Sequence, residues 1–271
     1  MKFIDKLQAS VVRNDSLVCV GLDSDAAKLP KGVDQLSFNK AIIDATHDLV
    51  AAYKPNTAFY EARGAEGITV LKETCEYIHQ KAPSVIIILD AKRADIGNTN
   101  AGYLQFAYDY LGADSITLHP YLGHEALEPF LARADKGAIV LCRTSNPGAG
   151  EFQDQYLDGH KLFEHVACMV AKDWNGNDNC MLVVGATYPD EARAIREAVG
   201  DNMWFLVPGV GAQGGDVQKT MEAAQNSRGS GLLINSSRGI IFASSGVDYA
   251  EAARQATITL RSEVNSYRKG K

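Results

Sequence analysis

The chain has 271 residues, 46% hydrophobic and 22% charged, and a formal net charge of -6. This length suits one α/β barrel, so we expect a single domain over residues 1–271. The acidic balance argues against general nucleic-acid binding, which needs a basic face. No window approaches the roughly 18 apolar residues of a membrane span. The N-terminus lacks an apolar signal-peptide core. We therefore expect a cytoplasmic protein without a membrane partner.

The cysteines and histidines show no metal-ligand pattern. No two of the five cysteines form a Cys-x-x-Cys pair, and His119/His124 and His160/His165 are five residues apart, not the four of helical zinc sites. The pattern predicts buried, reduced thiols and no transition-metal site.

Eight short, mostly apolar segments alternate with amphipathic stretches along the chain. Continuous apolar runs are typical of strands covered on both sides. The intervening helices carry start and stop signals, such as Pro189 and Gly200. The predicted strands are residues 17–23, 51–56, 85–92, 115–120, 138–144, 181–187, 204–211 and 231–238.

Eight strand-helix units predict an α/β fold, a single (β/α)8 TIM barrel. An open, doubly wound sheet is the alternative, because periodicity does not show closure. Short extra helices near residues 1–14 and after Phe242 are expected to cap the barrel.

Polar residues end nearly every predicted strand. In such barrels the strand ends and following loops build the active site at one face. The third strand is the most informative, because Asp90 and Lys92 point the same way and Asp95 lies beyond its end. The strand-end residues are Asp23, Lys54, Asn56, Asp90, Lys92, His119, Thr144, Ser145, Thr187, Gly211, Gln213, Ser237 and Arg238.

Two glycine-containing loops follow the seventh and eighth predicted strands. Residues 208–215 read Pro-Gly-Val-Gly-Ala-Gln-Gly-Gly, and residues 235–239 read Asn-Ser-Ser-Arg-Gly. Glycines let backbone N–H groups approach an anion, and Arg238 supplies a forked cationic donor. The pair of loops predicts a phosphate site, although glycines in either loop alone could simply form tight turns.

The second group of candidate site residues is charged and consists of Lys54, Asp90, Lys92 and Asp95. One interpretation is a structural ion-pair network at the barrel mouth. The other is catalytic: a substrate carboxylate beside Asp90 would be strained, and loss of carbon dioxide would relieve the repulsion. Lys92 could then stabilise and protonate the carbanion.

Five motifs in order, from Asp23 to Arg238, resemble the orotidine 5'-phosphate decarboxylase family, and residues 54–61 resemble its longer bacterial subgroup. They are Lys54-Pro55-Asn56, the Asp-x-Lys-x-x-Asp stretch at 90–95, Thr144-Ser145-Asn146-Pro147-Gly148, the 208–215 loop and Arg238. The resemblance implies a (β/α)8 homodimer that converts orotidine 5'-monophosphate to UMP and carbon dioxide. This is the last step of de novo pyrimidine synthesis, and it uses no metal or organic cofactor.

The resemblance also implies the roles of the charged residues. Lys92 would donate the proton, Asp90 would face the departing carboxylate, and Lys54 would complete the array beside the ribose. Asp95 would reach the partner's site across the dimer interface, with Ile96 and Thr99 beside it.

The remaining implied contacts bind the substrate. Asp23 would hold the ribose, and Ser145 would read the pyrimidine edge. Pro147 and Gly148 would belong to a loop over the base, although the 148–172 stretch is longer than a loop plus a helix requires. The implied phosphate ligands are Gln213, Gly214 or Gly215, and Arg238.

Three rival interpretations remain. Metal-dependent sugar-phosphate decarboxylases and synthases share the barrel, but they place a glutamate ligand where this chain has Lys54. A Schiff-base aldolase would use Lys54 or Lys92, yet the flanking aspartates keep both amines protonated. A non-catalytic nucleotide-binding barrel would explain the glycine loops but not the charged array.

Overall fold

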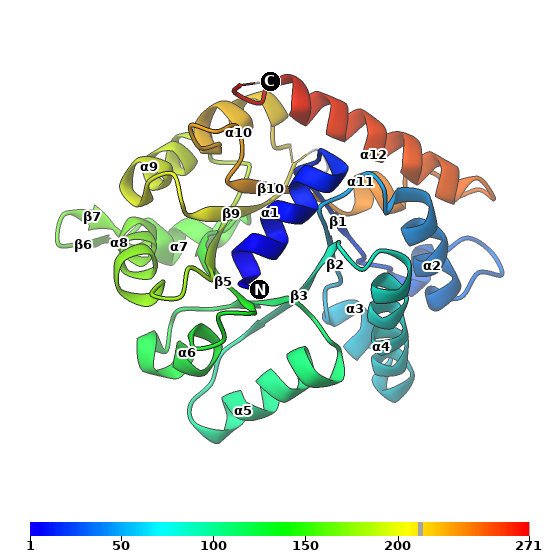
Figure 1. Ribbon diagram of the computed structural model, residues 1–271, viewed down its shortest axis with the longest axis horizontal. Helices are drawn as coiled ribbons and strands as arrows, with labels where there is room; N and C mark the ends of the chain where they lie inside the picture. Colours follow the sequence, from blue (N-terminus) through cyan, green and yellow to red (C-terminus); the bar gives the residue numbers. More distant parts are fainter. Residues whose placement is uncertain (211–213, 271) are drawn as a thin grey trace.

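In the computed structural model, which describes residues 1–210 and 214–270, eight parallel strands close into a barrel surrounded by helices (Figure 1). β1 (Val18–Gly21) pairs with both β2 (Ala52–Lys54) and β10 (Leu232–Ser236). This double pairing closes the sheet, so the barrel prediction is confirmed and the open-sheet alternative is wrong. The other barrel strands are β3 (Ile86–Arg93), β4 (Ser115–Leu118), β5 (Gly137–Arg143), β8 (Cys180–Val184) and β9 (Trp204–Pro208).

Helices fill the connections between the strands. The predicted helix signals at Pro189 and Gly200 are confirmed, because α9 begins at Pro189 and Gly200 caps it with φ 74°. The longer helices around the barrel are α2 (Gln35–Thr46), α4 (Gly64–Lys81), α5 (Asn98–Leu104), α6 (Gly123–Leu131), α8 (Leu162–Met169), α9 (Pro189–Val199), α10 (Val217–Ala224) and α12 (Tyr249–Ser266). Two π-helical turns, Gln105–Tyr110 and Val170–Trp174, extend α5 and α8.

The strands are buried on both faces, which explains their continuous apolar sequence. All residues of β1, β8 and β10 are buried. Several predicted strands extend beyond the observed ones at their C-terminal ends, as in 51–56 against Ala52–Lys54. The polar residues at these ends begin the loops, and they are the residues available to a site.

Helix α1 (Phe3–Asn14) lies across the end of the barrel where the strands begin (Figure 1). Its Phe3 is fully buried, and its N–H donates to the carbonyl of Ala134 at 2.9 Å. A Cβ at Gly137, the first residue of β5, would lie 2.5 Å from the Phe3 ring. The predicted N-terminal cap is therefore present, and a glycine provides the space for it.

The predicted short cap after Phe242 is wrong. The four-residue α11 (Arg238–Ile241) is followed by α12, which has 18 residues and lies in the outer layer. Arg254 of α12 binds the carboxylate of Asp48 at 2.7 Å and 2.9 Å, and the rings of Tyr249 and Phe38 stack at 5.1 Å. These contacts place α12 against α2 as the last helix of the ring.

The long 148–172 stretch folds into short elements before α8. They are a 3-10 turn (Pro147–Ala149), α7 (Gly150–Gln153) and a hairpin of β6 (Tyr156–Leu157) and β7 (His160–Lys161). The hairpin extends from the side of the barrel (Figure 1). The extra length of this segment is therefore ordered structure beside the β5 loop.

The thiol prediction holds for four of the five cysteines. All five are free; Cys19, Cys75, Cys142 and Cys180 are buried, whereas Cys168 is half-buried. Burial raises the pKa of the Cys19 thiol to about 12. These four thiols therefore stay protonated at neutral pH.

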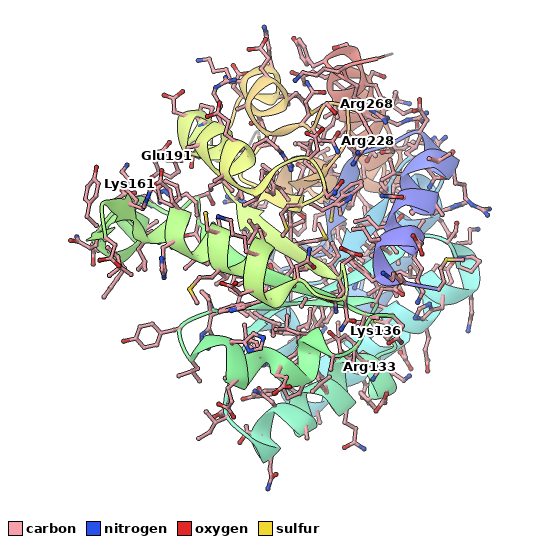
Figure 2. All side chains as sticks on the ribbon, turned by 60° about the vertical axis from the view of Figure 1, so that its left-hand side comes forward. Arg133, Lys136, Lys161, Glu191, Arg228 and Arg268 are labelled. Carbon is pink, nitrogen blue, oxygen red and sulfur yellow. The ribbon has the colours of Figure 1, made fainter. Side chains whose placement is uncertain are left out.

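Arg133 and Lys136 lie close together on the outside of the barrel (Figure 2), and both pack over the Tyr108 ring. Arg133 binds Asp135 at 3.0 Å, and Arg268 binds Asp15 at 3.2 Å. These carboxylates offset the positive charge locally. Within the described residues, no helix is both long and apolar enough to cross a bilayer.

Candidate active site

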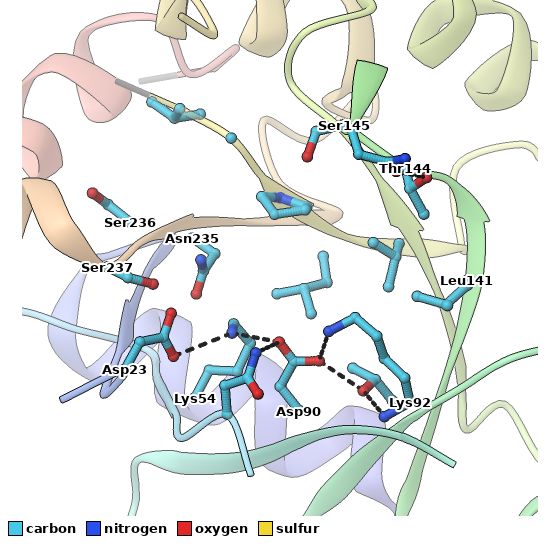
Figure 3. A pocket seen from close by; sticks show the side chains of 18 of the residues that line it. Asp23, Lys54, Asp90, Lys92, Leu141, Thr144, Ser145, Asn235, Ser236 and Ser237 are labelled. Carbon is cyan, nitrogen blue, oxygen red and sulfur yellow. Dashed lines mark hydrogen bonds and ion pairs between the residues drawn. The ribbon is translucent and has the colours of Figure 1, made fainter. Parts of the chain in front are cut away.

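A chain of alternating charges lies at the carboxyl end of the first three barrel strands (Figure 3). Lys54 Nζ lies 2.8 Å from Asp90 Oδ2 and 3.9 Å from Asp23 Oδ1. Lys92 Nζ lies 2.7 Å from Asp90 Oδ1. Asp90 and Lys92 of β3 therefore meet as predicted, and the pairing of β2 with β3 and of β1 with β2 brings Lys54 and Asp23 beside them.

The backbone beside β2 holds Asp90 in this position. The Asp90 N–H donates to the carbonyl of Pro55 at 3.0 Å, and the Thr57 N–H donates to the carbonyl of Asp90 at 3.2 Å. The Asn56 amide adds a donor 3.4 Å from Asp90 Oδ2. The Lys54-Pro55-Asn56 motif thus continues the pairing with β3 beyond the end of β2.

The array keeps its charges despite burial. Only 5% of the Lys54 side chain and 10% of the Asp90 side chain are exposed, against 48% for Lys92. Burial opposes ionisation of Asp90, but attraction to Lys54 and Lys92 outweighs it and lowers its pKa. Burial likewise opposes the charge of Lys54, but Asp90 and Asp23 raise its pKa. Asp90 is therefore a carboxylate and Lys54 an ammonium at neutral pH.

A cavity of about 520 Å³ opens over this array. Its apolar lining residues are Leu141, Val183, Leu206, Pro208 and Val210, and they lie beside polar and charged ones. Such a mixed lining suits a flat, partly apolar ring with polar substituents at its edges. Its polar lining residues are Asp23, Lys54, Asn56, Asp90, Lys92, Thr117, Thr144, Ser145, Asn146, Gln153, Asn235, Ser236, Ser237 and Arg238.

The loop after β5 supplies Thr144, Ser145 and Asn146 to the cavity. Gln153 of α7 accepts the N–H of Thr144 at 2.9 Å, and its own amide donates to the Thr144 hydroxyl at 2.9 Å. The ordered 148–172 segment therefore supports the loop. Pro147 lies on the exposed surface of the adjoining 3-10 turn rather than along the cavity wall.

The predicted phosphate loops meet at the other end of the cavity. Arg238 is exposed and lines the cavity together with Gly209, Ser236 and Ser237. Gly214 is exposed with φ 85°, and the Gly215 N–H donates to the carbonyl of Gly209 at 3.0 Å. Gly211 and Gln213 lie outside the described residues.

A Cβ on Gly215 would lie 2.6 Å from the Ala186 Cβ and 2.7 Å from the Gly209 carbonyl oxygen. This glycine is therefore required for close packing of the loop, which agrees with the turn-forming role considered from the sequence.

Asp95, Ile96 and Thr99 lie beyond the end of β3 and do not line the cavity of their own chain within the described residues. Asp95 Oδ1 accepts the Ile96 N–H at 2.7 Å, and the Ile96 side chain is 61% exposed. The protomer thus brings together three of the four predicted charged residues, Lys54, Asp90 and Lys92.

Sequence reasoning missed Thr117 and Gln153, and it included Asn235 only as the first residue of a predicted phosphate loop. Thr117 lies one residue before the end of β4, and the strand-end rule selected His119, which is half-buried outside the cavity lining. The alternation of β4, with Thr117 two residues after Ser115, was a usable signal. Asn235 precedes the end of β10, and Gln153 comes from the long insertion, where no pattern pointed inward.

Two of the polar lining residues have a buried side-chain oxygen that accepts no hydrogen bond within the described residues. These atoms are Asp23 Oδ1 and Asn235 Oδ1. A buried acceptor without a hydrogen bond costs free energy, so a ligand hydroxyl that donates to these oxygens would remove that cost.

Comparison with known proteins assigns the site to a family. Residues 16–255 match the model of the orotidine 5'-phosphate decarboxylase / HUMPS family. The chain belongs to this family. It is 49% identical to an orotidine 5'-phosphate decarboxylase of Cellvibrio japonicus, over 98% of both chains, and 47% identical to one of Azoarcus sp., over 99% and 100%.

A solved member of the family has the same architecture. The structure of Leishmania donovani OMP decarboxylase superposes with a TM-score of 0.85 at 38% identity, covering 99% of each chain. The family resemblance inferred from the motifs is thus confirmed, and with it decarboxylase function at the level of the family.

Proposed function

We propose that this protein decarboxylates orotidine 5'-monophosphate to UMP and carbon dioxide, the last step of de novo pyrimidine synthesis, as one domain over residues 1–271. Its main support is Asp90, an ionised carboxylate held between two ammonium groups under a cavity of about 520 Å³. The reaction takes place in the cytoplasm and uses no metal or organic cofactor.

The phosphate and the base bind at opposite ends of the cavity. Arg238, Gln213 and Gly214 or Gly215 hold the phosphate, and Ser145 reads the pyrimidine edge. Asp23 takes a ribose hydroxyl, which supplies the donor that its Oδ1 lacks among the described residues. Pro147 and Gly148 belong to the loop that covers the base.

The charged array then acts on the substrate carboxylate. Placed beside Asp90, this carboxylate is repelled in the ground state, and the repulsion disappears as the bond from C6 to the carboxyl carbon breaks. The electron pair of that bond remains on C6 of the pyrimidine ring, where the ammonium groups of Lys54 and Lys92 stabilise it. Lys92 Nζ transfers a proton to C6, giving UMP, and the neutral amine regains a proton from water.

Two copies of the chain complete each site. Asp95, Ile96 and Thr99 of one protomer contribute to the cavity of its partner, since they do not line their own within the described residues. A homodimer with an isologous interface gives two equivalent sites.

The charge arrangement weighs against the metal-dependent relatives. Both oxygens of Asp90 accept ammonium donors, at 2.8 Å and 2.7 Å, and a divalent cation there would lie against two positive charges. Asp90 and Asp23 also raise the pKa of Lys54, which favours its protonated form over a Schiff-base nucleophile.

The test follows the absorbance change of orotidine 5'-monophosphate with purified protein, with and without a chelator, and with Lys92→Ala. We expect turnover that resists the chelator and is abolished in Lys92→Ala. Loss of activity with the chelator would identify a metal-dependent relative. Tight UMP binding without turnover would identify a nucleotide-binding barrel.

A further inference from the structure

The backbone of Lys92 adopts a conformation that L-residues rarely occupy. Its φ is 46°, although it lies within β3. The register of β3 against β4 shifts between Leu89 and Arg93, so Lys92 lies in an irregularity of the ladder. Such a residue persists only when its surroundings hold it in place.

Thr117 of β4 holds this irregularity. Its side chain is buried, with 1% of the residue exposed, and its hydroxyl accepts the backbone N–H of Lys92 at 2.9 Å. The same hydroxyl lies 2.9 Å from Asp90 Oδ1. Asp90 Oδ1 in turn accepts Lys92 Nζ at 2.7 Å, which closes a ring of three hydrogen bonds.

The direction of each bond in the ring is determined by chemistry. A backbone N–H can only donate, so the hydroxyl accepts from Lys92. The single proton of the hydroxyl is then directed to Asp90, which accepts because it is ionised. The ring therefore couples the backbone and the ammonium of Lys92 to one carboxylate oxygen.

We propose that Thr117 is a positioning residue that sets the backbone of Lys92 and the plane of the Asp90 carboxylate, so that the Lys92 ammonium faces the reacting carbon. This inference rests on the proposed function, in which Lys92 donates the proton. Thr117 acts through these two residues rather than on the substrate.

The experiment compares Thr117→Val, which removes the hydroxyl at nearly constant volume, with Thr117→Ser, which keeps it. The control is Thr74→Val, because Thr74 is also fully buried and its hydroxyl accepts a bond from Asn39 at 3.0 Å, away from the cavity. The measurements are kcat, KM, UMP affinity and the thermal unfolding midpoint.

We expect Thr117→Val to lower kcat about 10- to 100-fold, as for a displaced catalytic group, with UMP affinity within about twofold of the native value. Thr117→Ser restores most of kcat, and Thr74→Val retains it. We also expect a crystal structure of Thr117→Val to show Lys92 at negative φ, or its Nζ displaced from Asp90.

An unchanged kcat in Thr117→Val would overturn the inference. So would a loss of UMP affinity equal to the loss of kcat, which would make Thr117 a ligand contact. If Thr117→Val does not fold, Thr117→Ser is compared with Thr117→Ala instead, because the first keeps the hydroxyl and the second removes it. Equal kcat values in these two variants would refute the inference. Native turnover in Lys92→Ala would instead refute the proposed proton donor.

Discussion

Asp90 is the residue on which the site is centred. Its two oxygens lie within hydrogen-bond distance of four side-chain donors: Lys54, Asn56, Lys92 and Thr117. Attraction to Lys54 and Lys92 lowers its pKa against the effect of burial. A carboxylate held so firmly cannot relieve repulsion by taking up a proton, which is the property that the proposed mechanism requires.

Asp90→Asn is expected to lower the free energy of unfolding by about 3 kcal/mol at pH 7, because it leaves the buried Lys54 charge poorly compensated. Asp178→Asn is the control, since its ion pair with Lys2 at 3.2 Å is exposed and is worth less than about 0.5 kcal/mol. Urea unfolding measures both. Equal effects of the two substitutions would show that the buried array does not stabilise the fold.

The pH dependence of this difference has a definite sign. The folded-state pKa of Asp90 is lowered, so its contribution is present above the ordinary value of 3.8 and is lost as the pH falls below it. The pKa of Lys54 is raised, so its contribution is present below 10.5 and is lost as the pH rises through the folded value. The difference between the native and Asp90→Asn proteins should therefore shrink as the pH falls below about 4. Urea unfolding between about pH 6 and about pH 3 measures it, and a constant difference across that range would refute the expectation.

Arg238→Ala is expected to weaken UMP binding by about 1.5–3 kcal/mol, the usual worth of a charge-assisted hydrogen bond. Turnover should also fall, because phosphate binding energy stabilises the closed state around the distant ring. Calorimetry with UMP and steady-state kinetics measure the two effects. Arg13→Ala, an exposed position on α1, is the control. Unchanged UMP affinity in Arg238→Ala would place the phosphate elsewhere.

At the scale of elements, the two ends of the barrel have separate tasks. The carboxyl ends of the strands carry the charged array and the cavity. The other end is closed by α1, whose Phe3 ring packs over Gly137. Stability contributed by α1 should therefore be separable from activity.

Phe3→Ala tests this separation. Removing a fully buried ring is expected to lower the free energy of unfolding by about 3–5 kcal/mol. At temperatures where the variant is folded, kcat and KM should equal the native values. Val12→Ala, on the same helix and 78% exposed, should change stability by less than about 0.5 kcal/mol. Altered KM in folded Phe3→Ala would show coupling between the two ends.

At the scale of the whole molecule, the protomer holds an incomplete version of the proposed site. Lys54, Asp90 and Lys92 meet in one cavity, whereas Asp95 lies outside its lining. In the proposed function, the missing carboxylate is the Asp95 of a second copy of the chain.

Mixing two inactive variants tests the shared site. Lys92→Ala and Asp95→Ala are each expected to be inactive alone. In mixed dimers one of the two sites has both residues intact, so random reassortment should restore about a quarter of the native activity. Each variant mixed with itself is the control. No recovery after confirmed subunit exchange would place both residues in the site of one chain.

The sequence alone determined much about this protein: eight apolar runs predicted the strands, and alternation placed Asp90 and Lys92 on one side of β3. Five motifs in order indicated the family. These features are local, because period, composition and spacing act within one segment.

Only the tertiary structure decided which segments meet. Closure of the barrel brought β1 beside β10. The irregular pairing of β3 with β4 brought Thr117 to Lys92. Helix α12 proved to be an outer helix rather than a cap. Contacts between distant segments depend on register and packing, which no single segment encodes. The depth of the charged array and the pKa shifts of Lys54 and Asp90 arise from that packing as well.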